Sequence, residues 1–217
     1  MKNYSLNSLM TQLSNHYLCG NMQNTRVITE NSQFDIIIER LCYQLIEDYN
    51  DFENTCIVGI QTGGVQLAER IIEKLTDILS RPSVMMIKAS RGCIVPLGKL
   101  DITFYRDDFR TSKKPLSAQE NDMPFIIENL KVILVDDVLY TGRSVQSALT
   151  ALNHYGRPHS VKLLVLVDRR FHRQIPVRPD YIGLSIDSVD EAYVHVEWGK
   201  NGENTEGGDK IILTNKK

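Results

Sequence analysis

The sequence predicts an α/β fold, a doubly wound and mainly parallel sheet with helices on both faces. Two segments support this prediction, 56–79 and 132–155, because each reads as a short apolar strand, a glycine-containing turn and an amphipathic helix. Two such units in one parallel sheet bring both turns to the carboxyl edge of the strands, where ligands bind in open α/β sheets. We therefore expect a ligand site at this edge.

The first half of the chain predicts two helices and two strands from the spacing of its apolar residues. A polar segment over 106–124 follows them and is long for a connection inside a compact domain. We expect this segment to form a flexible lid loop over the ligand site. The elements expected before it are a helix over 34–45, a buried strand at Cys56–Ile60, a helix over 65–79 and a strand at Leu100–Tyr105.

The segment Val132–Ser144, VILVDDVLYTGRS, is the most informative part of the chain. Its apolar run predicts a buried parallel strand that ends in Asp136 and Asp137, and a turn then opens the next helix, for which Thr141 or Ser144 is the expected N-cap. Carboxylates at this edge can bind sugar hydroxyls or a metal, and backbone N–H groups at a helix N-terminus can bind a phosphate. A sugar phosphate is the ligand that needs both groups.

The rest of the chain completes one domain. Val161–Val167 predicts another buried strand, and the alternating segments Tyr193–Trp198 and Lys210–Leu213 predict a C-terminal hairpin. Residues 1–24 are rich in Ser and Asn and are interpreted as an N-terminal extension. We assign residues 25–217 to a single domain.

Composition and missing motifs exclude several classes of protein. The 25 basic residues are balanced by 27 acidic ones, so there is no overall attraction to nucleic acid or to an anionic membrane. No apolar stretch is long enough to cross a bilayer, no signal peptide is present, and four unpaired cysteines indicate a reduced, cytoplasmic protein. The sequence also lacks the P-loop, the dinucleotide fingerprint, the hydrolase elbow and any metal-ligand spacing of histidines.

With these residues in place, the chain resembles the type I phosphoribosyltransferases, whose signature is two acidic residues followed by a Thr-Gly phosphate loop. The resemblance is stronger to one branch, the bifunctional pyrimidine operon regulatory protein/uracil phosphoribosyltransferase family. It covers about residues 33–190, and the segments that carry it are Gly59–Ala68, Gly98–Phe109, Val132–Leu149 and Leu164–Gly183.

The resemblance implies the roles of individual residues. Asp136 and Asp137 would bind the ribose hydroxyls of phosphoribosyl pyrophosphate, while Thr62 and Gly63 would meet its pyrophosphate with backbone N–H groups. Arg106, at the start of the lid, would hold pyrophosphate on closure and forms the catalytic set with the two aspartates. Magnesium is the implied cofactor and would be held mainly through the substrate. Thr141, Gly142, Arg143 and Ser144 would wrap the 5′-phosphate, and Val138, Leu139 and Tyr140 would also contact phosphoribosyl pyrophosphate. The base pocket would comprise Asp168, Arg169 and Val177.

The implied reaction transfers the phosphoribosyl group to uracil and yields UMP and pyrophosphate, a step of pyrimidine salvage. Such a reaction needs anion clamps, a divalent cation and exclusion of water more than a nucleophile, and no Ser, Cys or His here stands out as one. The resemblance also implies a homodimer or a larger homo-oligomer, with phosphoribosyl pyrophosphate and uracil or UMP as the bound partners and no membrane.

Three positions depart from the family pattern. Gly63 stands where many members carry Arg, which removes a guanidinium from the pyrophosphate turn. Tyr140 stands where purine-salvage enzymes carry an acidic residue, and this favours a pyrimidine. Arg170 and Phe171 add bulk ahead of the base pocket, where the family commonly has Gly, and this departure bears on the specificity for uracil.

Three alternatives remain open from the sequence. The first is a regulator of pyrimidine genes that binds an mRNA leader in response to uridine nucleotides, with weak or no catalysis; Glu39, Arg40 and Tyr43 align with the RNA-binding positions, and the acidic one opposes phosphates. The second is a catalytically silent sensor of phosphoribosyl pyrophosphate or uridine nucleotide. The third, a phosphorylated receiver domain, is disfavoured because its aspartates follow the first strand and no Thr-Gly turn lies behind them.

Overall fold

A five-stranded parallel sheet forms the centre of the computed structural model, which describes residues 25–30, 32–81, 95–106, 121–187, 192–199 and 208–214. Its strand order, β3-β2-β4-β5-β6, places β2 and β4, the strands of the two predicted units, side by side. The strands are β2 (Thr55–Ile60), β3 (Leu97–Leu100), β4 (Lys131–Leu139), β5 (Ser160–Arg169) and β6 (Tyr181–Ile186).

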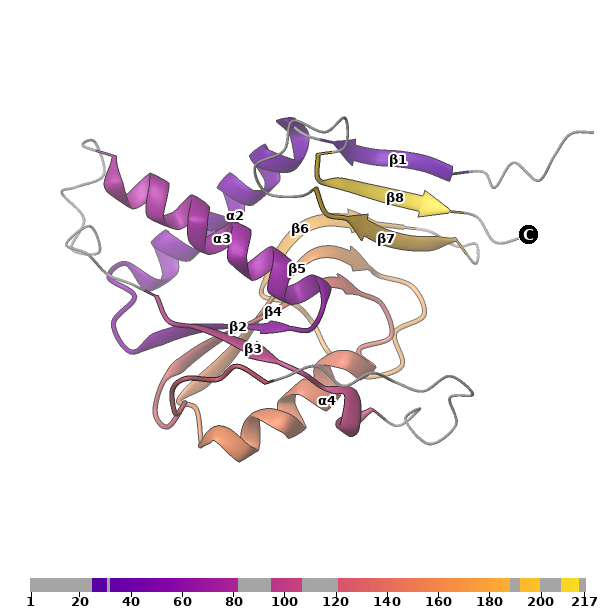
Figure 1. Cartoon of the computed structure of the whole chain (residues 1–217). Coiled ribbons are helices and arrows are strands. Elements are labelled where there is room, and N and C mark those ends of the chain that lie inside the picture. The colour runs from indigo at the N-terminus through magenta and orange to yellow at the C-terminus, as the bar shows by residue number, and fades with distance from the viewer. Residues whose placement is uncertain are drawn as a thin grey trace, which may run out of the picture.

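Helices cover both faces of this sheet. Figure 1 shows α2 (Ser32–Tyr49) and α3 (Gly63–Ser80) on one face and α4 (Arg143–Leu152) on the other. Each face carries its own apolar core, with Leu41 and Ile71 fully buried on the side of α2 and α3, and Ala148 of α4 fully buried on the other side. Strands buried on both faces read as unbroken apolar runs, which is why β2 and β4 were predictable from the sequence. The predicted doubly wound fold is confirmed.

A second, smaller sheet lies beside the carboxyl end of the parallel sheet (Figure 1). It consists of β7 (Tyr193–Glu197), β8 (Lys210–Thr214) and β1 (Thr25–Glu30), in the antiparallel order β1-β8-β7. The predicted C-terminal hairpin is therefore present as β7 and β8, and β1 from the other end of the chain extends it. We call these three strands the small sheet.

Arg70 on α3 ties the small sheet to the main body. Its guanidinium forms an ion pair with Asp209, donates to the Gly199 carbonyl at 2.9 Å, and lies 5.2 Å from the centre of the Trp198 ring. Trp198 also meets Phe34 edge to face, with ring centres 5.7 Å apart. Because Arg70 and Asp209 are both largely buried, this contact fixes the end of β7 over α3.

The predicted strand at Leu100–Tyr105 is wrong in its extent. β3 ends at Leu100, and a 3-10 turn occupies Thr103–Tyr105. The Asp101 carboxylate accepts hydrogen bonds from the backbone N–H and the hydroxyl of Thr103, at 2.8 Å and 2.5 Å, so a local turn replaces the sheet ladder there.

Two predictions fall largely on residues that the structure does not describe. The N-terminal extension, 1–24, lies entirely outside the described residues, and so does the lid loop except for 106 and 121–124. Among the described helices, none is long and apolar enough to cross a bilayer.

Candidate active site

Asp136 and Asp137 lie near the carboxyl end of β4, at the edge of the sheet where both helices α3 and α4 begin. Asp136 is 7% exposed, and its carboxylate accepts the backbone N–H of Asp137 at 3.1 Å. The Asp137 carboxylate accepts the N–H of Val138 at 2.8 Å. Burial raises the pKa of both carboxyls, and the neighbouring Asp137 charge raises the pKa of Asp136 further. Such a pair favours an arriving cation or a donor such as a sugar hydroxyl.

The first turn brings its backbone directly against this pair. Gly63 begins α3, and a Cβ atom there would lie 2.0 Å from Oδ2 of Asp137. A Cβ on Gly64 would lie 2.3 Å from the carbonyl oxygen of Val135. The peptide bond between Gln61 and Thr62 is cis. The two glycines therefore let the start of α3 touch β4, which leaves the N–H groups of its first turn close to the carboxylates.

The second turn opens α4 after Tyr140. Gly142 occupies the N-cap position with φ +89°, a conformation that favours glycine, and no side chain caps the helix. The expectation that Thr141 or Ser144 caps α4 is therefore wrong, because Gly142, which lies between them, occupies the N-cap position. The Thr141 carbonyl accepts the N–H groups of Gln174 and Ile175, both at 3.0 Å. The turn is thus held from behind and lies at the cavity, where the N-terminus of a helix can bind an anion.

The segment after β5 holds this turn in place through Arg173. Its guanidinium forms a largely buried ion pair with Asp168 and donates to the Tyr140 carbonyl at 2.7 Å. The neighbouring Arg169 is 5% exposed and lies over the Tyr140 ring, with 4.0 Å between the guanidinium carbon and the ring centre. Nε of Arg169 is buried and has no hydrogen-bond partner among the described residues. The end of β5 therefore carries a guanidinium whose Nε–H group has no acceptor among the described residues.

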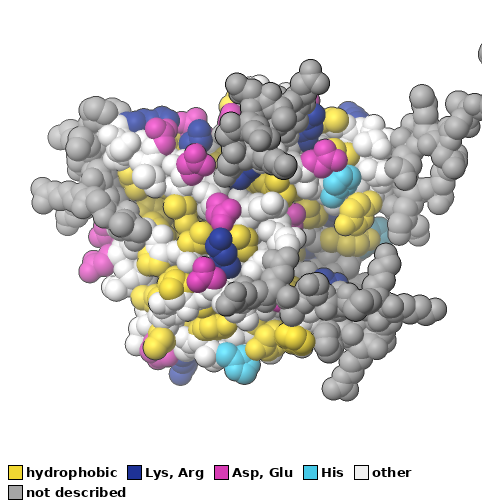
Figure 2. All heavy atoms as spheres, in the orientation of Figure 1, with side chains coloured by type: hydrophobic (Ala, Val, Ile, Leu, Met, Phe, Trp, Pro, Cys, Tyr) yellow, Lys and Arg dark blue, Asp and Glu magenta, His cyan; other side chains and the backbone are white. Residues whose placement is uncertain are grey.

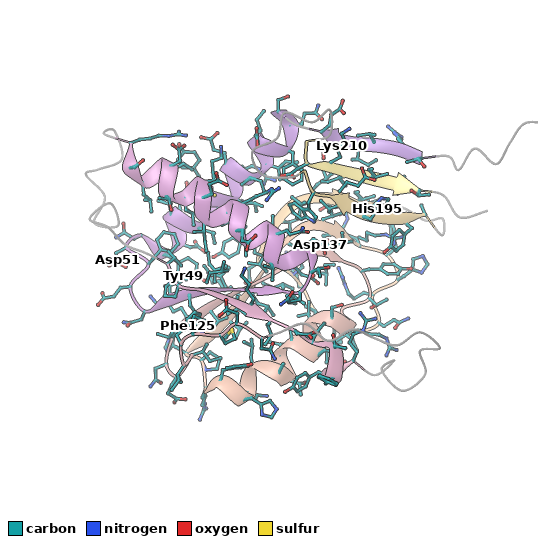
Figure 3. The ribbon with its side chains drawn as sticks, in the orientation of Figure 1. Tyr49, Asp51, Phe125, Asp137, His195 and Lys210 are labelled. Carbon is teal, nitrogen blue, oxygen red and sulfur yellow. The ribbon has the colours of Figure 1, made fainter. Side chains whose placement is uncertain are left out.

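A cavity of about 470 Å³ joins these parts, and it is about the size that a small-molecule site requires. Figure 3 labels two residues of its wall, Asp137 on β4 of the parallel sheet and His195 on β7 of the small sheet. The predicted residues that line it are Thr62, Gly63, Arg106, Asp136, Asp137, Val138, Leu139, Tyr140, Thr141, Gly142, Ser144 and Arg169. The structure therefore gathers both predicted turns, the acidic pair and the start of the lid at one cavity.

Three predicted residues do not line the cavity formed by the described residues. Arg143 donates from Nε to the Gln174 side chain at 2.6 Å, and Asp168 is turned toward Arg173. Val177 packs in the core beneath α4. Conversely, Tyr193, Val194 and His195 line the cavity and were missed. Their alternating pattern identified a strand, but the strand's position over the cavity depends on the distant contact with Arg70.

The acidic pair also bears on magnesium. Carboxylate oxygens are the ligands that Mg²⁺ prefers. Among the described residues, however, no three His, Cys, Asp or Glu side chains are grouped to hold a metal. The two aspartates therefore fit part of a magnesium site.

Comparison with known proteins decides the family. The family model for the phosphoribosyl transferase domain matches residues 24–200. The chain belongs to the type I phosphoribosyltransferases. Within these phosphoribosyltransferases it is similar to the bifunctional protein PyrR of Geobacter sp., with 37% identity over 85% of the chain and 97% of the relative. The bifunctional protein PyrR of Caldicellulosiruptor bescii is 39% identical over 81% of the chain and 89% of its own length.

Solved structures agree on the fold. A hypoxanthine phosphoribosyltransferase of Trypanosoma cruzi superposes with a TM-score of 0.63 and 16% sequence identity, and the match covers 90% of this chain and 97% of that protein. A phosphoribosyltransferase from Leishmania tarentolae, solved with GMP, covers 91% of the chain with 100% of its own, at a TM-score of 0.60 and 18% identity. At these identities the likeness establishes the phosphoribosyltransferase fold alone.

Proposed function

We propose that this phosphoribosyltransferase transfers the phosphoribosyl group of phosphoribosyl pyrophosphate to uracil and releases UMP and pyrophosphate. The observation that carries the proposal is the single cavity lined by Asp136, Asp137 and the turn at Thr141 and Gly142. The carboxylates suit the two ribose hydroxyls, and the N–H groups at the start of α4 suit the 5′-phosphate.

The charge distribution in the cavity suits the chemistry of this transfer. Loss of pyrophosphate from the anomeric carbon leaves positive charge on the sugar ring and negative charge on the leaving group. The Asp136 and Asp137 carboxylates would stabilise the ring, and the backbone turn at Thr62 and Gly63 would bind the leaving group. When bound, Mg²⁺ would neutralise charge on pyrophosphate, held by substrate oxygens beside the two aspartates.

The base is assigned from the two cavity residues Tyr140 and Arg169. Tyr140 presents an aromatic ring beside the buried Arg169 guanidinium, and both line the cavity. Arg169 has donors that match the carbonyl oxygens of a pyrimidine. No acidic side chain stands at position 140 to accept a proton from a purine ring nitrogen. The similarity to PyrR proteins supports the same choice.

A panel of bases tests the proposal directly. We expect pyrophosphate release from phosphoribosyl pyrophosphate to depend on uracil and Mg²⁺. We expect hypoxanthine, guanine and adenine to support at least about tenfold lower kcat/KM, because a site built to bind one set of polar groups leaves its own groups unpaired with another. Turnover with hypoxanthine but not uracil would contradict the base assignment, and no turnover with any base despite substrate binding would favour the silent sensor.

A regulator that binds RNA is the second candidate, supported by the word "bifunctional" in the names of the PyrR relatives. Contacts within the protein weigh against RNA binding by the aligned residues of α2. Glu39 pairs with Arg81 at 3.1 Å, and the Arg40 guanidinium donates to the carbonyls of Ile182 and Gly183. On the face shown in Figure 2, the described Lys and Arg side chains are scattered among Asp and Glu. A gel-shift assay with pyrimidine leader RNA, with and without UMP, separates this candidate from the enzyme.

A further inference from the structure

Strand β7 of the small sheet contributes side chains to the wall of the cavity. Tyr193, Val194 and His195 line it, and Val194 and Val196 also pack against the apolar core. Tyr193 is 59% exposed, and its ring stacks on the imidazole of His195 with centres 5.8 Å apart. The sequence prediction assigned no role to either side chain.

The contact between Arg70 and Trp198 links the end of β7 to α3. Thr62 and Gly63 at the start of α3 and His195 on β7 all line the same cavity. His195 therefore shares this cavity with the turn at Thr62 and Gly63, where the proposed function places pyrophosphate.

This end of the cavity needs hydrogen-bond donors. The turn Gln61–Gly64 contains no cationic side chain, and the nearby Asp136 and Asp137 carboxylates repel a pyrophosphate. Among the described residues that line the cavity, Arg106, Arg169 and His195 carry nitrogen donors on cationic or ionisable side chains. Arg169 is engaged over the Tyr140 ring at the base end. Arg106 and His195 are the other two side chains of this kind in the cavity wall.

The surroundings of His195 suit a donor. Its Nε2 lies 3.7 Å from Oε1 of Glu197, two residues along the same face of β7. Its Nδ1 is buried and has no hydrogen-bond partner among the described residues. A buried ring nitrogen without a partner raises the free energy of the ligand-free protein.

We propose that His195 is a further substrate-contacting residue, whose imidazole donates a hydrogen bond to the pyrophosphate group, and that Glu197 positions the ring. This inference rests on the proposed function, because it requires a pyrophosphate at the Thr62–Gly63 turn. It predicts that His195 affects binding of pyrophosphate and of phosphoribosyl pyrophosphate, but not binding of UMP, which leaves the pyrophosphate position empty.

Calorimetric titration of the full-length protein with inorganic pyrophosphate and Mg²⁺, and separately with UMP, tests this. We expect His195→Ala to raise the Kd for pyrophosphate about tenfold, the usual effect of losing one hydrogen bond to a charged group. His195→Gln, which keeps an N–H donor, should lose less. The matched control is His159→Ala, because His159 is exposed before β5 and does not line the cavity. Thermal melts of all variants show that each is folded.

The outcomes separate the two proposals. If the wild type binds pyrophosphate and both His195 variants bind it equally well, the role of His195 is refuted and the proposed function stands. If both variants lose UMP and pyrophosphate affinity to the same degree, His195 is structural and the inference is also refuted. If the wild type binds neither phosphoribosyl pyrophosphate nor pyrophosphate, the proposed function itself fails.

Discussion

At the residue scale, the adjacent carboxylates of Asp136 and Asp137 dominate the site. Two acids at the end of a buried strand raise the free energy of the folded protein, since both burial and mutual repulsion favour protonation. The fold retains this arrangement at the cavity that also contains two helix N-termini. The arrangement is understandable if a ligand supplies hydroxyl donors and positive charge.

The raised pKa of Asp136 predicts a stability effect that depends on pH. A carboxyl whose pKa is raised by folding gives its full stability below the pKa of the unfolded chain, 3.8, and loses it as the pH rises through the folded pKa. Asp136→Asn keeps an oxygen for the Asp137 N–H but carries no charge. In urea unfolding at pH 7.5 we expect it to be more stable than wild type by about 1–3 kcal/mol. The gap should vanish near pH 4, and an equal gap at both pH values would show that ionisation of Asp136 is not its cause.

The neighbouring glycines of the first turn should respond differently to substitution. Gly64→Ala places a Cβ 2.3 Å from the Val135 carbonyl, which is backbone of a buried strand, so we expect a loss of about 1–3 kcal/mol in thermal unfolding. Gly63→Ala meets the side chain of Asp137 instead, which can rotate. We expect its melting temperature to stay near wild type while its affinity for phosphoribosyl pyrophosphate falls. The reverse ranking in stability would show that the turn is packed otherwise.

At the element scale, the segment after β5 is bound to the turn that begins α4. Arg173 reaches Asp168 on β5 and the Tyr140 carbonyl at once, and Gln174 and Ile175 donate to the Thr141 carbonyl. The base end and the phosphate end of the cavity are therefore parts of one hydrogen-bonded unit. A change in this segment should affect both ends.

Arg173→Met tests this connection. It leaves the buried Asp168 carboxylate without its ion pair, a change that typically costs about 3–5 kcal/mol. We expect reduced stability in chemical denaturation and weaker binding of UMP. Arg170→Met is the matched control, because Arg170 forms an exposed pair with Asp187 worth less than about 1 kcal/mol. Equal effects of the two substitutions would mean that Arg173 does not link the two segments.

At the scale of the whole molecule, the predictable parts were those determined by local pattern. The run ahead of Asp136 indicated a strand buried on both faces, and the turn at Thr141 and Gly142 indicated a helix start. β1, whose sequence is TRVITE, has few apolar residues and exists because it pairs with β8 near the other end of the chain. His195 was missed for the same reason, since its place over the cavity follows from the long-range contact of Arg70 with Trp198. Long-range pairings of this kind leave little local signal.

The central claim is that the paired carboxylates and the turn after them bind the ribose 5-phosphate part of phosphoribosyl pyrophosphate. Calorimetric titration of wild type and Asp137→Asn with this ligand and Mg²⁺ tests it most directly. We expect saturable binding by the wild type and roughly tenfold or weaker binding by the variant, because one hydrogen-bonding carboxylate is lost while the fold is retained. Equal affinities, with both proteins folded, would contradict the assignment of Asp137 to the ribose.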